Sequence, residues 1–191
     1  MQKKSAKLLV AASRRPSSAK LRQVPVCGYA PSVGKKFFVF DNSPLAVLFR
    51  SYYRGRFPSL WEKFDGIVDE GRLLSTREVL NEINDSSITT LLDWAKNHGE
   101  IFGTLTAEEG TVVGQIFAVR HFQQNIEQKK LYKGGHNADA FVVAKAAVMD
   151  GTVVTLEHHA PNAARIPNIC QHFGILWLSR EEFMEAEGWE F

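Results

Sequence analysis

Short apolar runs that alternate with amphipathic stretches are the feature that most limits how this chain can fold. The clearest runs are residues 37–40, 152–156 and 175–178, and stretches with helical spacing lie between and after them. This order is typical of strand-helix-strand units, in which parallel strands form a sheet and the helices pack on it. The sequence therefore predicts an α/β fold around a mostly parallel sheet.

Helix-start and helix-stop residues mark the expected helices. Ser43 offers an N-cap with Pro44 at the first helical position, and a second helix over residues 58–70 ends at Gly71. Residues 72–75 are predicted to form a weak, short strand. One further helix is predicted to start at Thr76. Others are predicted over residues 91–96, 112–122, 138–149 and 166–173. A last helix is predicted after Ser179, where Glu182 occupies the capping-box position.

Charge is distributed unevenly along the chain. Residues 1–36 contain six Lys, three Arg and no acid, so they carry +9, while the remaining 14 basic residues and all 21 acids leave the rest at −7. The composition of residues 1–35 is typical of a flexible basic extension that contacts phosphates or directs the chain to an organelle. A disordered extension or a wrongly chosen start codon is the favoured explanation. We therefore expect an extension over 1–35 and one folded domain over 36–191.

Several protein classes are not favoured by the sequence. The chain has two cysteines, no CxxC pair and no recognisable secretory signal, so neither a disulfide scaffold nor secretion is indicated. Its apolar stretches are shorter than the roughly 20 residues that cross a bilayer. We expect a cytoplasmic protein without a membrane partner.

Two carboxylates follow apolar strands, where ligands gather in open α/β sheets. Asp41 directly follows residues 37–40, and Glu157 follows residues 152–156. Asn42, Ser43 and Thr155 are short polar neighbours. Each acid alone is better explained as a turn or capping residue.

Two further acids lie at the edges of buried helix faces. Asp139 begins the most apolar helix, where a negative charge also suits the helix dipole. Glu82 lies between inward apolar positions, and Glu78, one turn earlier, stays open as the alternative second acid. Together, Asp41, Glu82, Asp139 and Glu157 predict a site for Mg²⁺ or Mn²⁺, which prefer carboxylate oxygens. Such an ion activates water and neutralises phosphate charge, which is the chemistry of a nuclease.

Four segments, residues 38–43, 75–83, 138–144 and 153–157, resemble in order the motifs of PIN domains, the ribonuclease fold of VapC-type toxins, and especially a PIN-like family of uncharacterised bacterial proteins. The resemblance covers residues 36–191. It implies a three-layer α/β/α fold with four or five strands, one or two Mg²⁺ or Mn²⁺ ions, cleavage of single-stranded RNA and a cognate antitoxin. The four acids would be its catalytic and metal-binding residues. A homodimer stays open.

The sequence departs from the PIN pattern in two places. Glu157 stands where the pattern usually has Asp, so its ligation would pass through water, and the region between Asp85 and Gly135 matches no motif. No basic groove is evident. Substrate contact would then rest on Lys129, Lys130, Lys133 and the basic extension.

Other interpretations compete with an active nuclease. A haloacid-dehalogenase-like phosphatase would use Asp41 as nucleophile, but Ser43 stands where that family has a second Asp. A PIN-like module that binds RNA or protein without cleaving is the alternative from another class. A zinc site at His158 and His159 lacks a third ligand at a recognised spacing, and Cys170 is better explained as a buried, inert thiol.

Overall fold

The protein is represented by a computed structural model that describes residues 35–123 and 137–191. Almost all of the predicted basic extension lies outside the described residues, as do Lys129, Lys130 and Lys133. Their predicted contacts with substrate stay predictions.

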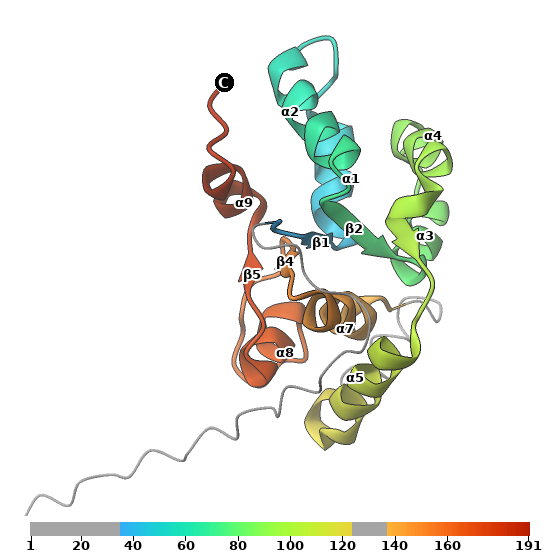
Figure 1. The fold of residues 1–191 in the computed structure, drawn as a ribbon, viewed down its shortest axis with the longest axis vertical. Helices are drawn as coiled ribbons and strands as arrows, with labels where there is room; N and C mark the ends of the chain where they lie inside the picture. The colour runs from blue at the N-terminus through green and yellow to red at the C-terminus, as the bar shows by residue number, and fades with distance from the viewer. Residues whose placement is uncertain (1–34, 124–136) are drawn as a thin grey trace, which may run out of the picture. The chain divides into compact units, whose positions relative to one another are not determined.

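Five parallel strands form a sheet in the order β3-β2-β1-β4-β5 (Figure 1). The predicted α/β fold, with four or five strands between two helical layers, is confirmed. The strand order reverses direction between β1 and β4, because β2 and β3 follow on one side and β5 on the other. The strands are β1 Phe38–Phe40, β2 Leu73–Thr76, β3 Phe102–Gly103, β4 Thr152–Val154 and β5 Trp177–Leu178.

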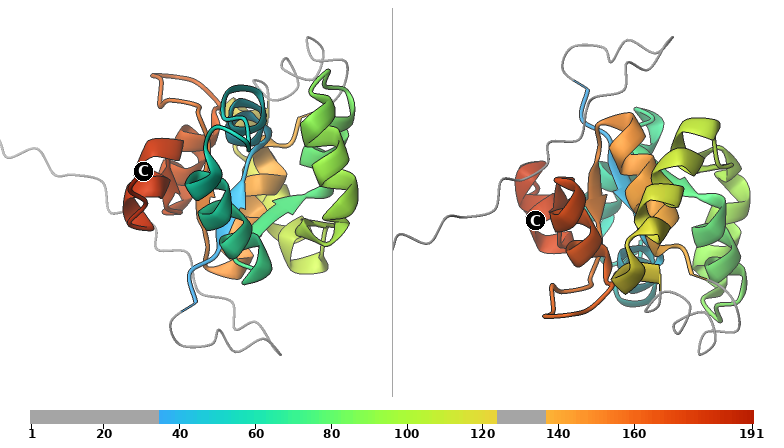
Figure 2. Two further views of the ribbon diagram at one scale, coloured as in Figure 1. Left: turned by 90° about the horizontal axis from the view of Figure 1, so that it is seen from above. Right: turned by 90° about the horizontal axis from the view of Figure 1, so that it is seen from below.

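Helices cover both faces of this sheet (Figures 1 and 2). α1, α2 and α9 lie on one face, α5, α7 and α8 lie on the other, and α3 and α4 flank the β2–β3 side. The helices are α1 Asn42–Ser51, α2 Pro58–Asp69, α3 Arg77–Asn84, α4 Thr89–Asn97, the 3-10 turn η1 Gly99–Ile101, α5 Ala107–Ala118, α7 Asp139–Met149, α8 Ile166–Phe173 and α9 Arg180–Ala186.

The central strand β1 is buried on both faces, which explains its uninterrupted apolar sequence. Phe38 and Phe40 make edge-to-face contacts with Phe183 of α9 at ring-centroid distances of 4.8 and 5.1 Å. Val39 is fully buried, and its side chain points to the opposite face because side chains alternate along a strand. Packing on both faces therefore fixes the position at which β1 ends.

Four local predictions differ from the structure. The helix predicted over residues 112–122 is α5, which begins at Ala107 after the Thr106–Glu109 capping box and ends at Ala118. Ser43 is not an N-cap, because α1 begins at Asn42 with Asp41 in the extended cap position, and the Ser43 hydroxyl donates to Asp41. β4 ends at Val154, two residues before the predicted end, although the Thr155 N–H still donates to the Leu178 carbonyl. β3 was missed because a two-residue strand carries no periodicity.

Among the described helices, none is long and apolar enough to cross a membrane.

A buried ion pair joins α5 to α7. The Lys145 ammonium donates to Glu109 Oε1 at 2.9 Å, with only 10% and 4% of the two side chains exposed. The other oxygen of Glu109 accepts the Thr106 N–H, which completes a capping box at the start of α5. Both oxygens of Glu109 are thus satisfied inside the protein, and loss of Lys145 would leave a buried carboxylate without its counter-charge.

We predict that Lys145→Met lowers the free energy of unfolding by about 3–5 kcal/mol, because breaking a buried pair leaves an uncompensated charge. Urea denaturation at neutral pH measures this loss. Lys96→Met is the matched control, since Lys96 and its partner Asp93 are 70% and 75% exposed, and it should change stability by less than about 1 kcal/mol. Equal effects of the two variants would contradict the structural role of the buried pair.

Candidate active site

The carboxyl ends of β1 and β4 lie side by side at the point where the strand order reverses. Ligands of open α/β sheets bind in the crevice at such a point. Asp41 follows β1, and its N–H donates to the Val154 carbonyl of β4 at 3.0 Å. This hydrogen bond places Asp41 beside Thr155, the first residue after β4.

Asp41 is 7% exposed and accepts hydrogen bonds from two hydroxyls. Ser43 Oγ lies 2.6 Å and Thr155 Oγ1 lies 3.1 Å from Asp41 Oδ2. The hydroxyl oxygens in turn accept backbone N–H groups, Ser43 from Leu156 and Thr155 from Glu157. Because their lone pairs face these amides, both hydroxyl hydrogens point at Asp41, and the carboxylate is held in one orientation.

Two further predicted acids act on Asp41 through their charge. Burial raises the pKa of Asp41, and the nearby Asp139 and Glu82 carboxylates raise it further, while the Ser43 hydrogen bond acts in the opposite direction. Asp139 is itself buried, as the first residue of α7. The structure therefore brings together three of the four predicted acids, Asp41, Glu82 and Asp139, and we call them the acidic cluster.

Glu82, rather than Glu78, is the second acid of this cluster. Its Oε1 accepts the Ala138 N–H at the start of α7 at 3.2 Å. Its Oε2 lies 3.5 Å from the side-chain amide nitrogen Nδ2 of Asn42. Glu82 thereby links α3 to the starts of α1 and α7. This position places Glu82 beside Asp41, and its predicted role as a metal ligand stays a prediction.

The Glu157 carboxylate accepts a hydrogen bond at the start of α8. Its Oε2 accepts the N–H of Ile166, the first residue of α8, at 2.8 Å. This bond satisfies an amide that has no partner within the helix, and the negative charge suits the positive end of the helix dipole. Glu157 thus closes the loop after β4, and its predicted metal-binding role stays a prediction.

Asn137 is a site residue that the sequence analysis missed. It is buried, its Oδ1 accepts the Asp139 N–H at 3.0 Å, and its amide nitrogen has no hydrogen-bond partner. An Asn two residues before an Asp at a helix start is a known capping arrangement, so the sequence did carry a signal.

The donor set of the acidic cluster fits a hard cation in its chemistry. Carboxylate oxygens dominate, and the Oδ1 of neighbouring Asn42 is buried without a hydrogen-bond partner. However, within residues 35–123 and 137–191, no group of three or more His, Cys, Asp or Glu side chains is arranged to hold a metal ion. Glu82 Oε1 already accepts the Ala138 N–H, which leaves Oε2 as its more available oxygen for a cation. The cluster thus has the chemistry of a metal site without a formed ligand shell.

The competing sites considered from the sequence gain no support. Burial raises the pKa of Cys170 to about 12, so this thiol stays protonated and is a poor nucleophile. His158 and His159 are exposed in the loop after β4, and they belong to no metal-binding group among the described residues.

Comparison with known protein families identifies the family to which this chain belongs. A family described as a domain of unknown function, DUF4411, matches residues 38–191. The chain belongs to this family. The DUF4411 domain begins at the first residue of β1 and includes every described strand and all members of the acidic cluster. No curated protein matches the sequence.

We predict that Asp41→Asn raises the stability of this DUF4411 domain at about pH 7 by about 0.5–2 kcal/mol, as is common when a strained site is relieved. The raised pKa means that the folded state binds more protons than the unfolded state, so the wild type loses stability as pH rises through the folded-state pKa. The gain should therefore shrink towards about pH 4, near the ordinary pKa of Asp.

Urea denaturation of both proteins in a chelating buffer at the two pH values measures the difference. Asp93→Asn is the control, because the Asp93 side chain is 75% exposed, and it should have little effect at either pH. A destabilised Asp41→Asn protein at neutral pH would refute this account of Asp41.

Proposed function

We propose that this chain is a metal-dependent endoribonuclease of PIN type, which hydrolyses RNA phosphodiester bonds with Mg²⁺ or Mn²⁺ and serves as the toxin of a toxin-antitoxin pair. The observation that carries the proposal is the buried Asp41 at the carboxyl end of the central strand, with Asp139 and Glu82 close enough to raise its pKa. Buried like charges are costly without a cation between them. The order of the four PIN-like motifs supports the same function.

The residues of the site divide the proposed work between them. Asp41 and Asp139 would be the primary ligands, and Glu82 and Glu157 would complete the site directly or through water. A bound cation would supply an activated water and would neutralise charge on the phosphate. Ser43 and Thr155 hold Asp41 in place, so that its carboxylate does not have to reorganise when substrate binds.

A catalytically inactive RNA- or protein-binding module is the second candidate. It is favoured by the two glutamates, since Glu82 and Glu157 each accept a backbone N–H at a helix start. Such carboxylates serve the fold even without a metal. A phosphatase with Asp41 as nucleophile is less supported, because Ser43 stands where that family has its second Asp.

Metal binding separates the two candidates without an activity assay. We predict that Mn²⁺ at about 100 times its dissociation constant stabilises the wild-type protein by about 2.7 kcal/mol, measured as a rise in the thermal midpoint. Asp41→Asn and Asp139→Asn should abolish this rise, and Asp93→Asn should retain it. No rise with either Mn²⁺ or Mg²⁺ in the wild type would favour the inactive module.

We further predict that the purified protein cleaves single-stranded RNA with Mg²⁺ or Mn²⁺ and is inactive with a chelator. Asp41→Asn and Asp139→Asn should each lower the rate by more than about 100-fold, since outer partners of a metal site alone cost about 10–100-fold. Gel analysis of labelled RNA measures cleavage, with Asp93→Asn as the control. Full activity in both site variants would disprove the proposed nuclease site. Relief of expression toxicity by a neighbouring gene tests the antitoxin.

A further inference from the structure

The turn between α1 and α2 is a basic and aromatic corner on an acidic domain. Between Asp41 and Glu62 the chain has three Arg and no acid, whereas residues 37–191 as a whole carry −7. We call residues 50–57 the α1–α2 tip, and its sequence, Arg-Ser-Tyr-Tyr-Arg-Gly-Arg-Phe, interleaves positive and aromatic side chains. This composition is typical of surfaces that bind single-stranded nucleic acid.

Part of the α1–α2 tip serves the fold. Arg54 forms a bidentate ion pair with Asp65 at 2.6 and 2.9 Å and lies over the Trp61 ring at 4.1 Å from its centroid. The Trp61 indole N–H donates to the Tyr52 carbonyl at 2.7 Å. These contacts anchor the α1–α2 tip to α2, so its remaining side chains are presented from a fixed backbone.

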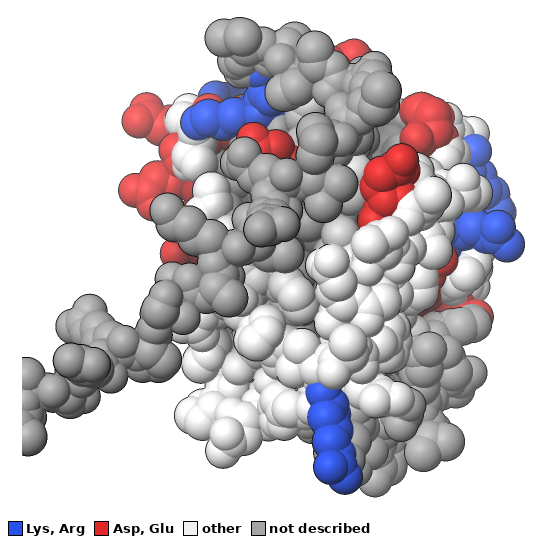
Figure 3. All heavy atoms as spheres, turned by 60° about the horizontal axis from the view of Figure 1, so that its bottom comes forward, with Lys and Arg blue, Asp and Glu red and all other residues white. Residues whose placement is uncertain are grey.

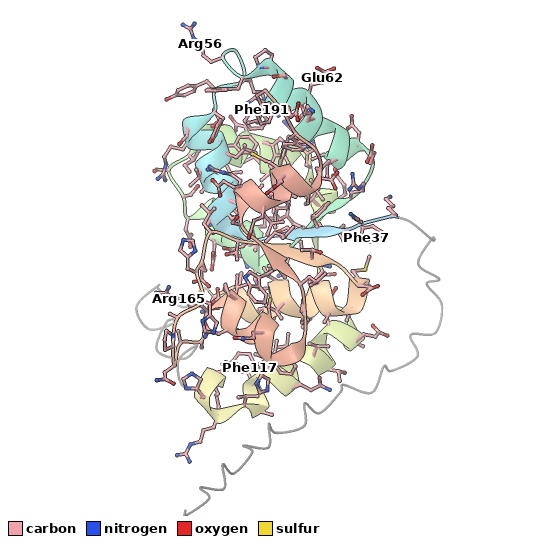
Figure 4. The ribbon with its side chains drawn as sticks, turned by 90° about the vertical axis from the view of Figure 1, so that its left-hand side faces the viewer. Phe37, Arg56, Glu62, Phe117, Arg165 and Phe191 are labelled. Atoms are coloured by element: carbon pink, nitrogen blue, oxygen red, sulfur yellow. The ribbon has the colours of Figure 1, made fainter. Side chains whose placement is uncertain are left out.

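The remaining side chains of the α1–α2 tip face solvent. Tyr53 is 67% and Phe57 is 40% exposed, which is unusual for large aromatic residues. Arg50 and Arg56 are exposed, and neither forms an ion pair with a described residue. Figure 4 shows Arg56 pointing outward beyond the ribbon. Two cations and two rings are therefore available to a ligand.

The face drawn in Figure 3 offers no comparable surface among its described residues. Its Lys and Arg side chains lie in separate places, with a broad uncharged area between them. The α1–α2 tip is thus a concentrated basic feature, and it is connected directly to the proposed site, since α1 begins next to Asp41 and its ten residues span about 15 Å.

We propose that the α1–α2 tip binds single-stranded RNA, with Tyr53 and Phe57 stacking on bases and Arg50 and Arg56 contacting phosphates. This inference rests on the proposed ribonuclease function and names the surface that holds its substrate. At the stacked rise of about 3.4 Å per nucleotide, the distance along α1 corresponds to about four or five nucleotides. A strand of that length or longer can contact the α1–α2 tip while a phosphate reaches the acidic cluster. The favourable contact is electrostatic, because a polyanion meets an acid-free segment with three Arg in an otherwise acidic domain.

Binding is tested on the full-length protein in a chelating buffer, so that the result does not depend on cleavage. The probe is a labelled oligouridine of about 12 nucleotides, within the range that single-strand binding folds cover, and the readout is fluorescence anisotropy. Tyr53→Ala should weaken binding roughly 5- to 150-fold, the loss typical of one base-stacking ring. Tyr53→Phe keeps the ring and should restore most of the affinity.

The phosphate contacts have a separate readout. Replacing both Arg50 and Arg56 with Ala should reduce the slope of log Kd against log salt by about 1.4, which is the value for two phosphates on a single strand. Matched controls are Arg120→Ala, an exposed arginine two residues after α5, and Phe191→Ala, a ring that is 66% exposed. Both should stay within roughly twofold of wild type. The basic extension is present in the wild type and in every variant, so its contribution to binding cancels when their dissociation constants are compared.

Three outcomes would overturn the proposal. Unchanged affinity and salt slope in the variants of the α1–α2 tip would do so, even if the protein cleaves RNA. Equal sensitivity of a duplex RNA to Tyr53→Ala would also exclude base stacking, because paired bases do not expose their faces. Binding of an acidic peptide instead of RNA, lost in the same variants, would assign the surface to a protein partner. Failure of the nuclease itself is recognised separately, by intact RNA with added metal despite normal binding.

Discussion

The pairing of β1 with β4 is the interaction on which the rest of this structure depends. Phe38, Val39 and Phe40 pair in register with Thr152, Val153 and Val154, so the two strands end together. The strand order reverses at this pair, and residues that are more than a hundred positions apart meet beyond it. Asp41 and Thr155 are neighbours for this reason alone. Without this register, the two hydroxyls that orient Asp41 would not converge on one oxygen.

The acidic residues of the site also have structural roles. Glu82 and Glu157 accept amides at the starts of α7 and α8, where the helix leaves N–H groups without internal partners. Asp41 also receives a backbone hydrogen bond from Asn42, but its burial next to like charges raises its pKa and makes the charged form unfavourable in the folded state. Unfavourable placement of a polar group is the pattern expected where function, rather than stability, selects a residue.

Arginines in this protein divide into those that hold the fold and those that are available. Arg72 donates to both oxygens of Glu187 at 2.6 and 2.7 Å and fastens the segment after α9 to the start of β2. Arg54 anchors the α1–α2 tip through Asp65. Arg50 and Arg56 form no such pair with a described residue, and they lie on the segment that carries exposed aromatic rings. Arg50 and Arg56 therefore place unpaired positive charge beside the exposed rings of the α1–α2 tip.

The sequence alone determined the fold class and most element boundaries, because these depend on local patterns. α2 and α8 begin and end close to their Pro and Gly signals, and α9 begins at its capping box. The apolar runs mark β1, β4 and β5. The predictions were wrong where a strand was very short or where a side chain forms a different hydrogen bond from the expected one. β3 has only two residues, and the Ser43 hydroxyl serves Asp41 instead of capping α1.

The site was only partly determined by the sequence. The order of the acids predicted which side chains to examine, but the choice of Glu82 over Glu78, the direction of Glu157 towards Ile166 and the participation of Asn137 depended on contacts between distant elements. The sequence thus determined that Asp41 ends a buried strand, since that follows from the apolar run before it. Only the tertiary structure decided which charges surround Asp41, because parallel pairing and helix packing, rather than spacing along the chain, bring those residues together.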